Sequence, residues 1–241
     1  KMSKIIVAID NMEYDSFTKL QKQLEDNVYG YKVRSLALNN EVKTRYAIPN
    51  LMLEMLDMKF YDIPSSIMEI LLKSLDLGYD ICTVHMTADF KGNSDINKFI
   101  AGVSILTSFS GKDCELYYND TTLNTIKKMH DRALKYGYGY FVCSAQDLNF
   151  LDLSDSIKYI CPGIRYESSD KHDQERVMTP IRAVQAGADY LVIGRMITQA
   201  VDPLKTVKKI NLEVENYKNC KEEMYENKPI KLADGRYIYS T

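Results

Sequence analysis

Short apolar runs alternate with longer amphipathic stretches along most of this chain. Each run has the length of one buried strand, and most of the stretches between the runs can hold a helix. Parallel strands need such crossovers, so the alternation predicts a parallel sheet covered by helices. The runs lie at 5–9, 31–35, 51–56, 81–85, 102–106, 140–144, 157–161 and 190–194.

The number of runs decides between two α/β architectures. Eight strand units in 241 residues fit a closed (β/α)₈ barrel, a TIM barrel in a single domain, better than two doubly wound halves. The segment AIDNMEYD after the first run lacks G-x-G-x-x-G, which argues against a dinucleotide fold. We expect the barrel over residues 1–217 and a C-terminal extension, residues 218–241, packed on it. Helices are expected near 13–24, 65–77, 121–136, 179–186 and 203–217.

Composition narrows the class of partner. The formal net charge is -2, so the chain has no general attraction for nucleic acid or anionic membranes. No apolar run approaches the roughly 20 residues of a membrane span, and the start of the chain resembles a strand rather than a signal peptide. The five cysteines lack C-x-x-C spacing and the three histidines lie far apart. These patterns predict reduced thiols, no metal site and a cytoplasmic protein.

Charged residues stand at the ends of the predicted strands. In a (β/α)₈ barrel the active site lies at the C-terminal ends of the strands, while the interior is filled with apolar side chains. Asp10 ends the first run and Lys32 lies in the second. The segment MLDMKFYDIP (55–64), which overlaps the end of the third run, holds Asp57, Lys59 and Asp62. Alternate residues of a strand point to one side, so Asp57 and Lys59 are expected to face the same way, beside Lys32.

Two lysines and two aspartates in one place form a neutral group that can be buried at tolerable cost. A lysine between two carboxylates stays protonated, so it is a proton donor rather than a Schiff-base nucleophile. A carboxylate fixed beside it would repel a substrate carboxylate, and the ammonium group would protonate the carbanion left behind. The pattern therefore predicts decarboxylation without a cofactor. The alternative for the charged residues alone is a structural salt-bridge cluster at the barrel rim.

The seventh and eighth runs end in residues typical of a phosphate site. Pro162 follows the seventh run, and a polar loop at 166–180 has the length of a lid. The eighth run ends in Gly194 and Arg195. The loops after strands 7 and 8 usually hold phosphate in this barrel, where Arg195 would make a bidentate contact. The alternative for Arg195 is a rim salt bridge.

Five segments, in order, resemble the orotidine 5′-phosphate decarboxylase family. MLDMKFYDIP is similar to the family's signature around its catalytic lysine. The other segments are VSILTS (103–108), CPGIR (161–165), DQERVMTP (173–180) and GADYLVIGR (187–195). The resemblance runs from about Ile5 to Pro203 and implies a homodimer that decarboxylates orotidine 5′-monophosphate to uridine 5′-monophosphate in pyrimidine biosynthesis, without a cofactor.

The resemblance also implies a role for each matching residue. Lys59 would protonate C6 of the pyrimidine, Asp57 would lie beside the substrate carboxylate, and Lys32 would hold Asp57. Asp62 would enter the site from the partner subunit. The implied substrate-binding residues are Asp10 and Ser66 near the ribose, Ser108 at the pyrimidine edge, and Pro162, Gln174, Gly194 and Arg195 around the phosphate.

The chain departs from the family pattern at several positions. Arg34 stands where the family usually has glycine, Ser65 and Ser66 replace Asn-Thr, and Met196 replaces a common proline. The stretch between the fourth and fifth runs is short for a helical crossover. Arg34 adds charge near the site, and we hypothesise that it perturbs nucleotide binding.

Two other functions remain open. A sugar-phosphate decarboxylase of the same barrel superfamily shares D-x-K-x-x-D, but such enzymes usually bind a metal ion. A non-catalytic nucleotide-binding barrel is the other alternative. The lysine–aspartate set argues against it, because a binding module has no need to hold a carboxylate against the carboxylate of its ligand.

Overall fold

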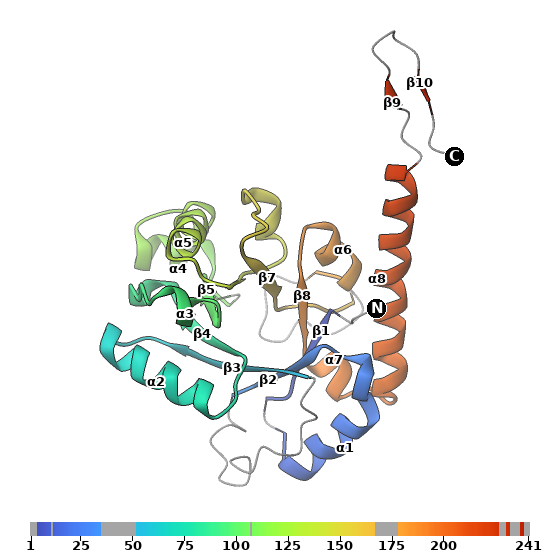
Figure 1. Cartoon of the computed structure of the whole chain (residues 1–241), viewed down its shortest axis with the longest axis horizontal. Coiled ribbons are helices and arrows are strands. Elements are labelled where there is room, and N and C mark those ends of the chain that lie inside the picture. Colours follow the sequence, from blue (N-terminus) through green and yellow to red (C-terminus); the bar gives the residue numbers. More distant parts are fainter. Residues whose placement is uncertain are drawn as a thin grey trace.

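Eight parallel strands close into a barrel in order along the chain, which confirms the predicted fold. This computed structural model describes residues 4–10, 12–34, 52–106, 108–166, 178–226, 230–231 and 237–238. In Figure 1 the strands lie at the centre with the helices around them. The strands are β1 (Ile5–Ala8), β2 (Gly30–Val33), β3 (Leu53–Phe60), β4 (Ile81–His85), β5 (Ile100–Val103), β6 (Tyr140–Val142), β7 (Lys158–Cys161) and β8 (Tyr190–Ile193).

Closure is visible at β1, whose Ile6 pairs in parallel with Gly30 of β2 on one side and with Val192 of β8 on the other. Short 3-10 turns, η1 (Glu25–Asn27), η4 (Met86–Ala88) and η5 (Asp147–Phe150), add to the connections. The helices are α1 (Tyr14–Leu24), α2 (Pro64–Asp76), α3 (Ser94–Asn97), α4 (Gly111–Tyr118), α5 (Thr122–Tyr136), α6 (Pro180–Gln185), α7 (Arg195–Thr198) and α8 (Pro203–Glu226). Five helices of the described ranges, α1, α2, α5, α6 and α8, occupy the stretches that the sequence predicted.

Three short helices were not expected from the sequence. The connection from β4 to β5, noted as short for a crossover, holds only η4 and the four-residue α3 in place of a long helix. α4 precedes α5 in one connection, and α7 follows β8 directly. β3 also continues to Phe60, four residues beyond its expected end.

A layer of six buried residues fills the barrel interior, and a larger core lies between the strands and the helices. Full burial of one such side chain contributes about 1.5–3 kcal/mol. The interior layer consists of Ile6, Met55, Ile81, Ala101, Ile160 and Val192.

Three tyrosines pack against this layer near the N-terminal ends of the strands. The rings of Tyr29 and Tyr190 lie 4.6 Å apart, and their hydroxyls form a hydrogen bond of 3.1 Å. Tyr140, the first residue of β6, lies 6.4 Å from the Tyr190 ring. These rings fill space at the N-terminal end, and in this fold the substrate site lies at the opposite, C-terminal end of the strands.

The last long helix crosses the expected boundary between barrel and extension. α8 runs without interruption from Pro203 to Glu226, so residue 217 falls inside it. A two-stranded pair, β9 (Ile230–Lys231) and β10 (Tyr237–Ile238), lies beyond the end of α8 in Figure 1. The division at residue 218 and the packing of residues 218–241 stay predictions. No helix in the described ranges is long and apolar enough to cross a membrane.

Candidate active site

Lys32 brings two strand ends together at the C-terminal end of the barrel. It lies on β2 and is buried, with 9% of its side chain exposed. Its Nζ is 2.8 Å from Asp10 Oδ2, just after β1, and 2.9 Å from Asp57 Oδ2 on β3. The two carboxylates compensate the charge of the buried ammonium, and this compensation is what makes its burial tolerable.

Asp57 is held between two lysines. Lys59 Nζ lies 2.7 Å from Asp57 Oδ1, while Lys32 binds the other carboxylate oxygen. Burial by itself raises the pKa of Asp57, but attraction and hydrogen bonding from Lys32 and Lys59 outweigh it and lower the pKa below its ordinary value. Asp57 is therefore a buried carboxylate anion, and Lys59, with 29% of its side chain exposed against 9% for Lys32, is the more accessible of the two lysines.

The strand that carries Asp57 and Lys59 is irregular at this point. Leu56 pairs with Cys82 and Phe60 with Val84, so three residues of β3 lie opposite the single residue Thr83 of β4. Lys59 has a φ of 52°, in the left-handed region that L side chains rarely adopt. The two charged groups meet on a bulge rather than on the regular strand that the alternation predicted.

Two polar residues of β4 lie near the cluster, and sequence reasoning missed both. The Thr83 hydroxyl accepts a hydrogen bond of 2.7 Å from the Lys59 backbone N–H and lies 3.3 Å from Asp57 Oδ1. Burial, with the positive charge of Lys59, lowers the pKa of His85, whose Nδ1 lies 2.6 Å from the Thr87 hydroxyl. Polar residues inside the apolar run ICTVH were the available signal.

The loop from β3 to α2 carries Asp62, which among the described residues forms no ion pair with Lys32 or Lys59 of the same chain. Asp62 is exposed, and its Oδ1 accepts a hydrogen bond of 2.6 Å from the Ile63 N–H, just before α2 begins at Pro64. Ser66 lies half-buried in the first turn of α2, and Ser108 is exposed between β5 and α4.

The expected phosphate residues follow β7 and β8. Pro162 comes directly after β7, and Gly194 separates β8 from α7, whose first residue is the exposed Arg195. These positions put all three at the same end of the barrel as the lysine–aspartate cluster. Gln174 lies outside the described residues.

Arg34 extends the charged cluster on the side of β1. Its Nε lies 4.0 Å from Asp10 Oδ1, and half of its side chain is exposed. Asp10 Oδ1 is itself buried and makes no hydrogen bond in the described part of the chain. Arg34 thus faces a neighbouring acid rather than bulk solvent alone.

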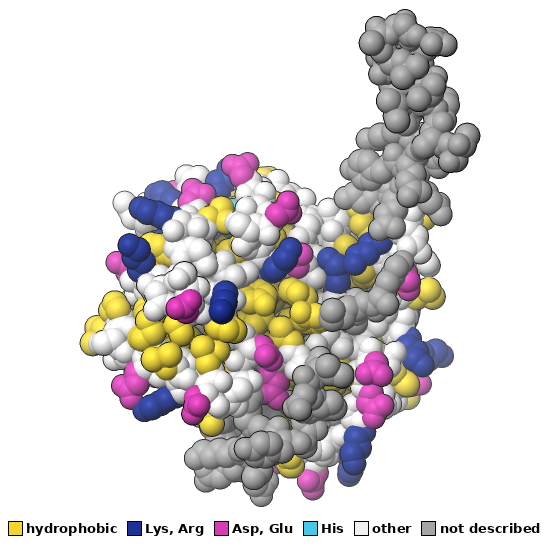
Figure 2. All heavy atoms as spheres, in the orientation of Figure 1, with side chains coloured by type: hydrophobic (Ala, Val, Ile, Leu, Met, Phe, Trp, Pro, Cys, Tyr) yellow, Lys and Arg dark blue, Asp and Glu magenta, His cyan; other side chains and the backbone are white. Residues whose placement is uncertain are grey.

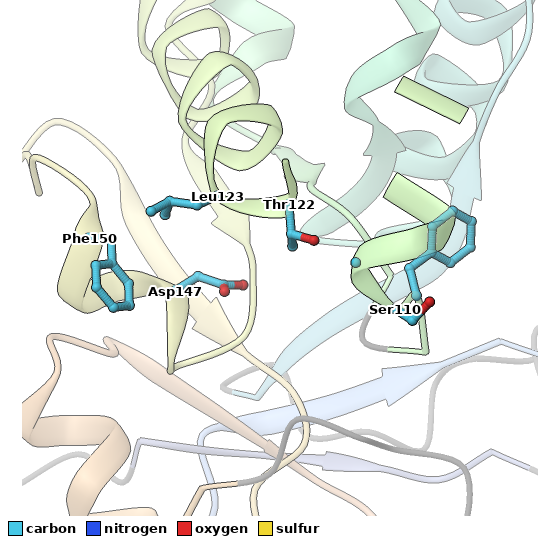
Figure 3. A pocket seen from close by; sticks show the side chains of 7 residues that line it. Ser110, Thr122, Leu123, Asp147 and Phe150 are labelled. Carbon is cyan, nitrogen blue, oxygen red and sulfur yellow. The ribbon is translucent and has the colours of Figure 1, made fainter. Parts of the chain in front are cut away.

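A separate cavity of about 340 Å³ lies between η5 and the first turns of α4 and α5. In Figure 3 the Asp147 and Thr122 side chains point into this space. None of the residues that the sequence singled out as site residues lines it, so the cavity and the lysine–aspartate cluster are different features. Its lining residues are Phe109, Ser110, Gly111, Thr122, Leu123, Asp147 and Phe150.

The described ranges contain no group of three or more His, Cys, Asp or Glu side chains placed to hold a metal ion. The charged residues that do converge pair carboxylates with ammonium groups at 2.7–2.9 Å. This arrangement can hold an anionic carboxylate beside a proton donor, which is what acid-assisted loss of a substrate carboxylate requires.

Comparison with known proteins places this geometry in a family. A model of the orotidine 5′-phosphate decarboxylase / HUMPS family matches residues 3–210. The orotidine 5′-phosphate decarboxylase of Idiomarina loihiensis is 33% identical over 229 residues, covering 87% of this chain and 96% of that protein. That of Coxiella burnetii is also 33% identical, over 232 residues, with 88% and 96% covered.

Solved structures agree on the fold. The crystal structure of orotidine 5′-phosphate decarboxylase from Lactobacillus acidophilus aligns with a TM-score of 0.71 at 23% identity, covering 89% of this chain and 99% of that one. The enzyme from Pyrococcus horikoshii gives a TM-score of 0.70 at 23% identity, with 88% and 99% covered. By the family model and by its curated relatives, this chain belongs to the orotidine 5′-phosphate decarboxylase / HUMPS family.

Proposed function

We propose that this chain is a carboxy-lyase that converts orotidine 5′-monophosphate into uridine 5′-monophosphate for pyrimidine biosynthesis. The observation that carries the proposal is the Asp57 carboxylate, fixed 2.9 Å from Lys32 and 2.7 Å from Lys59. A buried carboxylate paired in this way stays charged, and a charged carboxylate beside a proton donor suits the loss of CO₂. Two 33% identical relatives named orotidine 5′-phosphate decarboxylase support the same substrate.

In the proposed reaction the substrate carboxylate lies against Asp57. Two like charges about 4 Å apart repel by roughly 4 kcal/mol at an effective dielectric constant near 20, and the repulsion disappears as CO₂ leaves. The bond from C6 to the carboxylate breaks and its electron pair remains on C6. The Lys59 ammonium stabilises this charge and then donates its proton to C6. Lys59 regains a proton from water, so the proposed cycle needs no cofactor.

Binding of the rest of the nucleotide is proposed for residues around the same end of the barrel. Asp10, held by Lys32, would bind ribose hydroxyls together with Ser66, and Ser108 would contact the pyrimidine edge. The phosphate would lie near Pro162, Gly194 and Arg195, with Gln174 as a further ligand. Phosphate binding far from C6 can supply energy for organising the reacting groups.

The proposed enzyme is a homodimer in which Asp62 reaches the site of the partner subunit. Asp62 is exposed in its own chain, and large apolar side chains are exposed around it, including Tyr61 at 71% and Ile63 at 63%. On α4, Leu116 and Tyr117 are exposed by 75% and 68%. Figure 2 shows hydrophobic side chains gathered in a band across one face of the molecule. Such a face suits an interface with a second copy.

We also propose that the enzyme works in the cytoplasm. All five cysteines are free, and four of them are buried. Free buried thiols suit a reducing compartment, whereas secreted proteins of this size commonly carry disulfides. Fractionation of the host cell followed by an activity assay tests this placement.

The decisive experiment is Lys59→Ala. We expect loss of orotidine 5′-monophosphate turnover by at least about 10³-fold, measured as the decrease in orotate absorbance, because the variant lacks the proposed proton donor. Binding of uridine 5′-monophosphate, measured by calorimetry, should persist. Lys73→Ala, on the exposed face of α2, is the matched control and should keep full activity. Full activity of Lys59→Ala would refute the proposed mechanism.

The sugar-phosphate alternative makes a different prediction. A metal-dependent decarboxylase would lose its activity when a chelator is added, and it would accept a keto-sugar phosphate. The names of the curated relatives favour the nucleotide. Turnover of orotidine 5′-monophosphate that is unchanged in excess EDTA would reject the alternative.

A further inference from the structure

The irregularity in β3 is where the two reacting side chains are brought together. Between the pairs Leu56–Cys82 and Phe60–Val84, three residues of β3 lie opposite Thr83. A bulge of this kind removes ladder hydrogen bonds and re-aims side chains. Lys59 sits in this bulge with a left-handed φ of 52°, which a lysine adopts only when surrounding contacts hold it there.

Thr83 supplies such a contact. Its side chain is buried, with 0% of the residue exposed. Its hydroxyl oxygen accepts the hydrogen bond from the Lys59 backbone N–H at 2.7 Å. This bond satisfies a backbone donor that the bulge leaves without a strand partner.

The same hydroxyl has one proton to donate and two acceptors within reach. Asp57 Oδ1 lies at 3.3 Å and the Leu56 carbonyl oxygen at 3.4 Å. A charged acceptor gives the stronger hydrogen bond, so the Asp57 carboxylate is the preferred partner. Asp57 Oδ1 is also the oxygen that binds Lys59 Nζ at 2.7 Å.

We propose that Thr83 is a positioning residue of this active site: its buried hydroxyl fixes the Lys59 backbone and the Asp57 carboxylate relative to each other. It touches the backbone of the proposed acid and the oxygen with which that acid pairs, but it has no access to substrate. The expected loss of turnover on removing this hydroxyl rests on the proposed function. The expected change in the position of Lys59 relative to Asp57 does not.

Three variants of this chain test the proposal. Thr83→Val keeps the shape and removes the hydroxyl, Thr83→Ser keeps the hydroxyl, and Thr125→Val is the matched control. Thr125 is a buried threonine of α5 whose hydroxyl donates to the Thr121 carbonyl oxygen at 2.9 Å, away from the cluster.

For Thr83→Val we expect kcat to fall about 10- to 100-fold while KM changes less than about threefold, because misplacement of a reacting group by an ångström costs up to about 10² in rate. Thr83→Ser should recover kcat to within about threefold of the unmodified protein, and Thr125→Val should leave kcat unchanged. If Thr83 were merely structural, kcat would fall equally in Thr83→Val and Thr125→Val, or Thr83→Ser would fail to recover kcat. Either of these results would overturn the proposal.

A crystal structure of Thr83→Val separates this proposal from the proposed function. We expect Lys59 to leave the left-handed region, or its Nζ to move beyond 4.0 Å from Asp57 Oδ1. If the unmodified protein fails to turn over orotidine 5′-monophosphate but the variant shows this shift, the proposed function fails and the positioning role stands. An unchanged bulge and ion pair in Thr83→Val would reject the positioning role, whatever the activity.

Discussion

Arg34 places a second cation at the end of β2, two residues after Lys32 and on the same side of the strand. Its Nε approaches Asp10 Oδ1 to 4.0 Å, but half of the side chain is exposed. Half-exposed pairs of this kind contribute at most about 1 kcal/mol to stability. The larger effect of Arg34 is therefore expected on the binding of an anionic nucleotide next to Asp10.

Replacing Arg34 tests that effect. For Arg34→Gly we expect KM for orotidine 5′-monophosphate to rise about two- to tenfold at low salt, with kcat nearly unchanged, because a nearby positive charge attracts the substrate anion. The increase should shrink at 0.5 M salt, where such attraction is screened. Arg34→Lys keeps the charge and should stay close to the unmodified enzyme. Unchanged steady-state constants for Arg34→Gly at both salt concentrations would contradict this role.

At the scale of elements, the hydrophobic alternation predicted the strand order and most helices but not the bulge. The residues 51–56 predicted only the first part of β3, since the two-residue period of a strand carries no information on how β3 pairs with β4. α4 was missed although its capping box, Ser110 with Asp113, is visible in the sequence. The left-handed Lys59 is contacted by Thr83, which lies 24 residues away in the sequence, and no local pattern reveals this contact.

The packing of α5 against the barrel contains a buried histidine whose protonation opposes folding. His130 of α5 is 1% exposed, and its Nε2 lies 3.0 Å from the Tyr159 hydroxyl of β7. Burial lowers the pKa of His130, against weaker opposing effects of Asp131 and Asp152. The unfolded chain therefore binds this proton more readily than the folded one, and stability is lost as the pH falls below about 6.5.

His130→Gln isolates this contribution. Between pH 7.5 and pH 5.5 we expect the free energy of unfolding to fall more in the unmodified protein than in the variant. The difference between the two proteins is at most about 1.4 kcal/mol for each pH unit by which folding lowers the pKa of His130. Urea unfolding of both proteins at both pH values measures how the free energy of unfolding of each depends on pH. Equal pH dependence of stability in the two proteins would mean that the pKa of His130 is the same in the folded and the unfolded state.

At the scale of the whole molecule, a single chain does not bring together all the residues assigned to the site. Asp10, Lys32, Asp57 and Lys59 converge within one barrel, whereas Asp62 lies exposed before α2. The sequence motif D-x-K-x-x-D contains Asp57, Lys59 and Asp62. The sequence does not tell whether Asp62 acts in its own subunit or in the partner subunit. In the proposed dimer each site combines Lys59 of one chain with Asp62 of the other.

Mixing two inactive variants tests this arrangement directly. Lys59→Ala and Asp62→Ala should each be nearly inactive as homodimers. After equal amounts are unfolded and refolded together, half of the dimers are mixed, and in each of these one of the two sites carries both native residues. We therefore expect about a quarter of the activity of the unmodified enzyme, against almost none when the variants are refolded separately. Affinity tags of two kinds show whether mixed dimers form. If they form but activity does not return, Asp62 acts in the site of its own subunit and the proposal of a shared site is wrong.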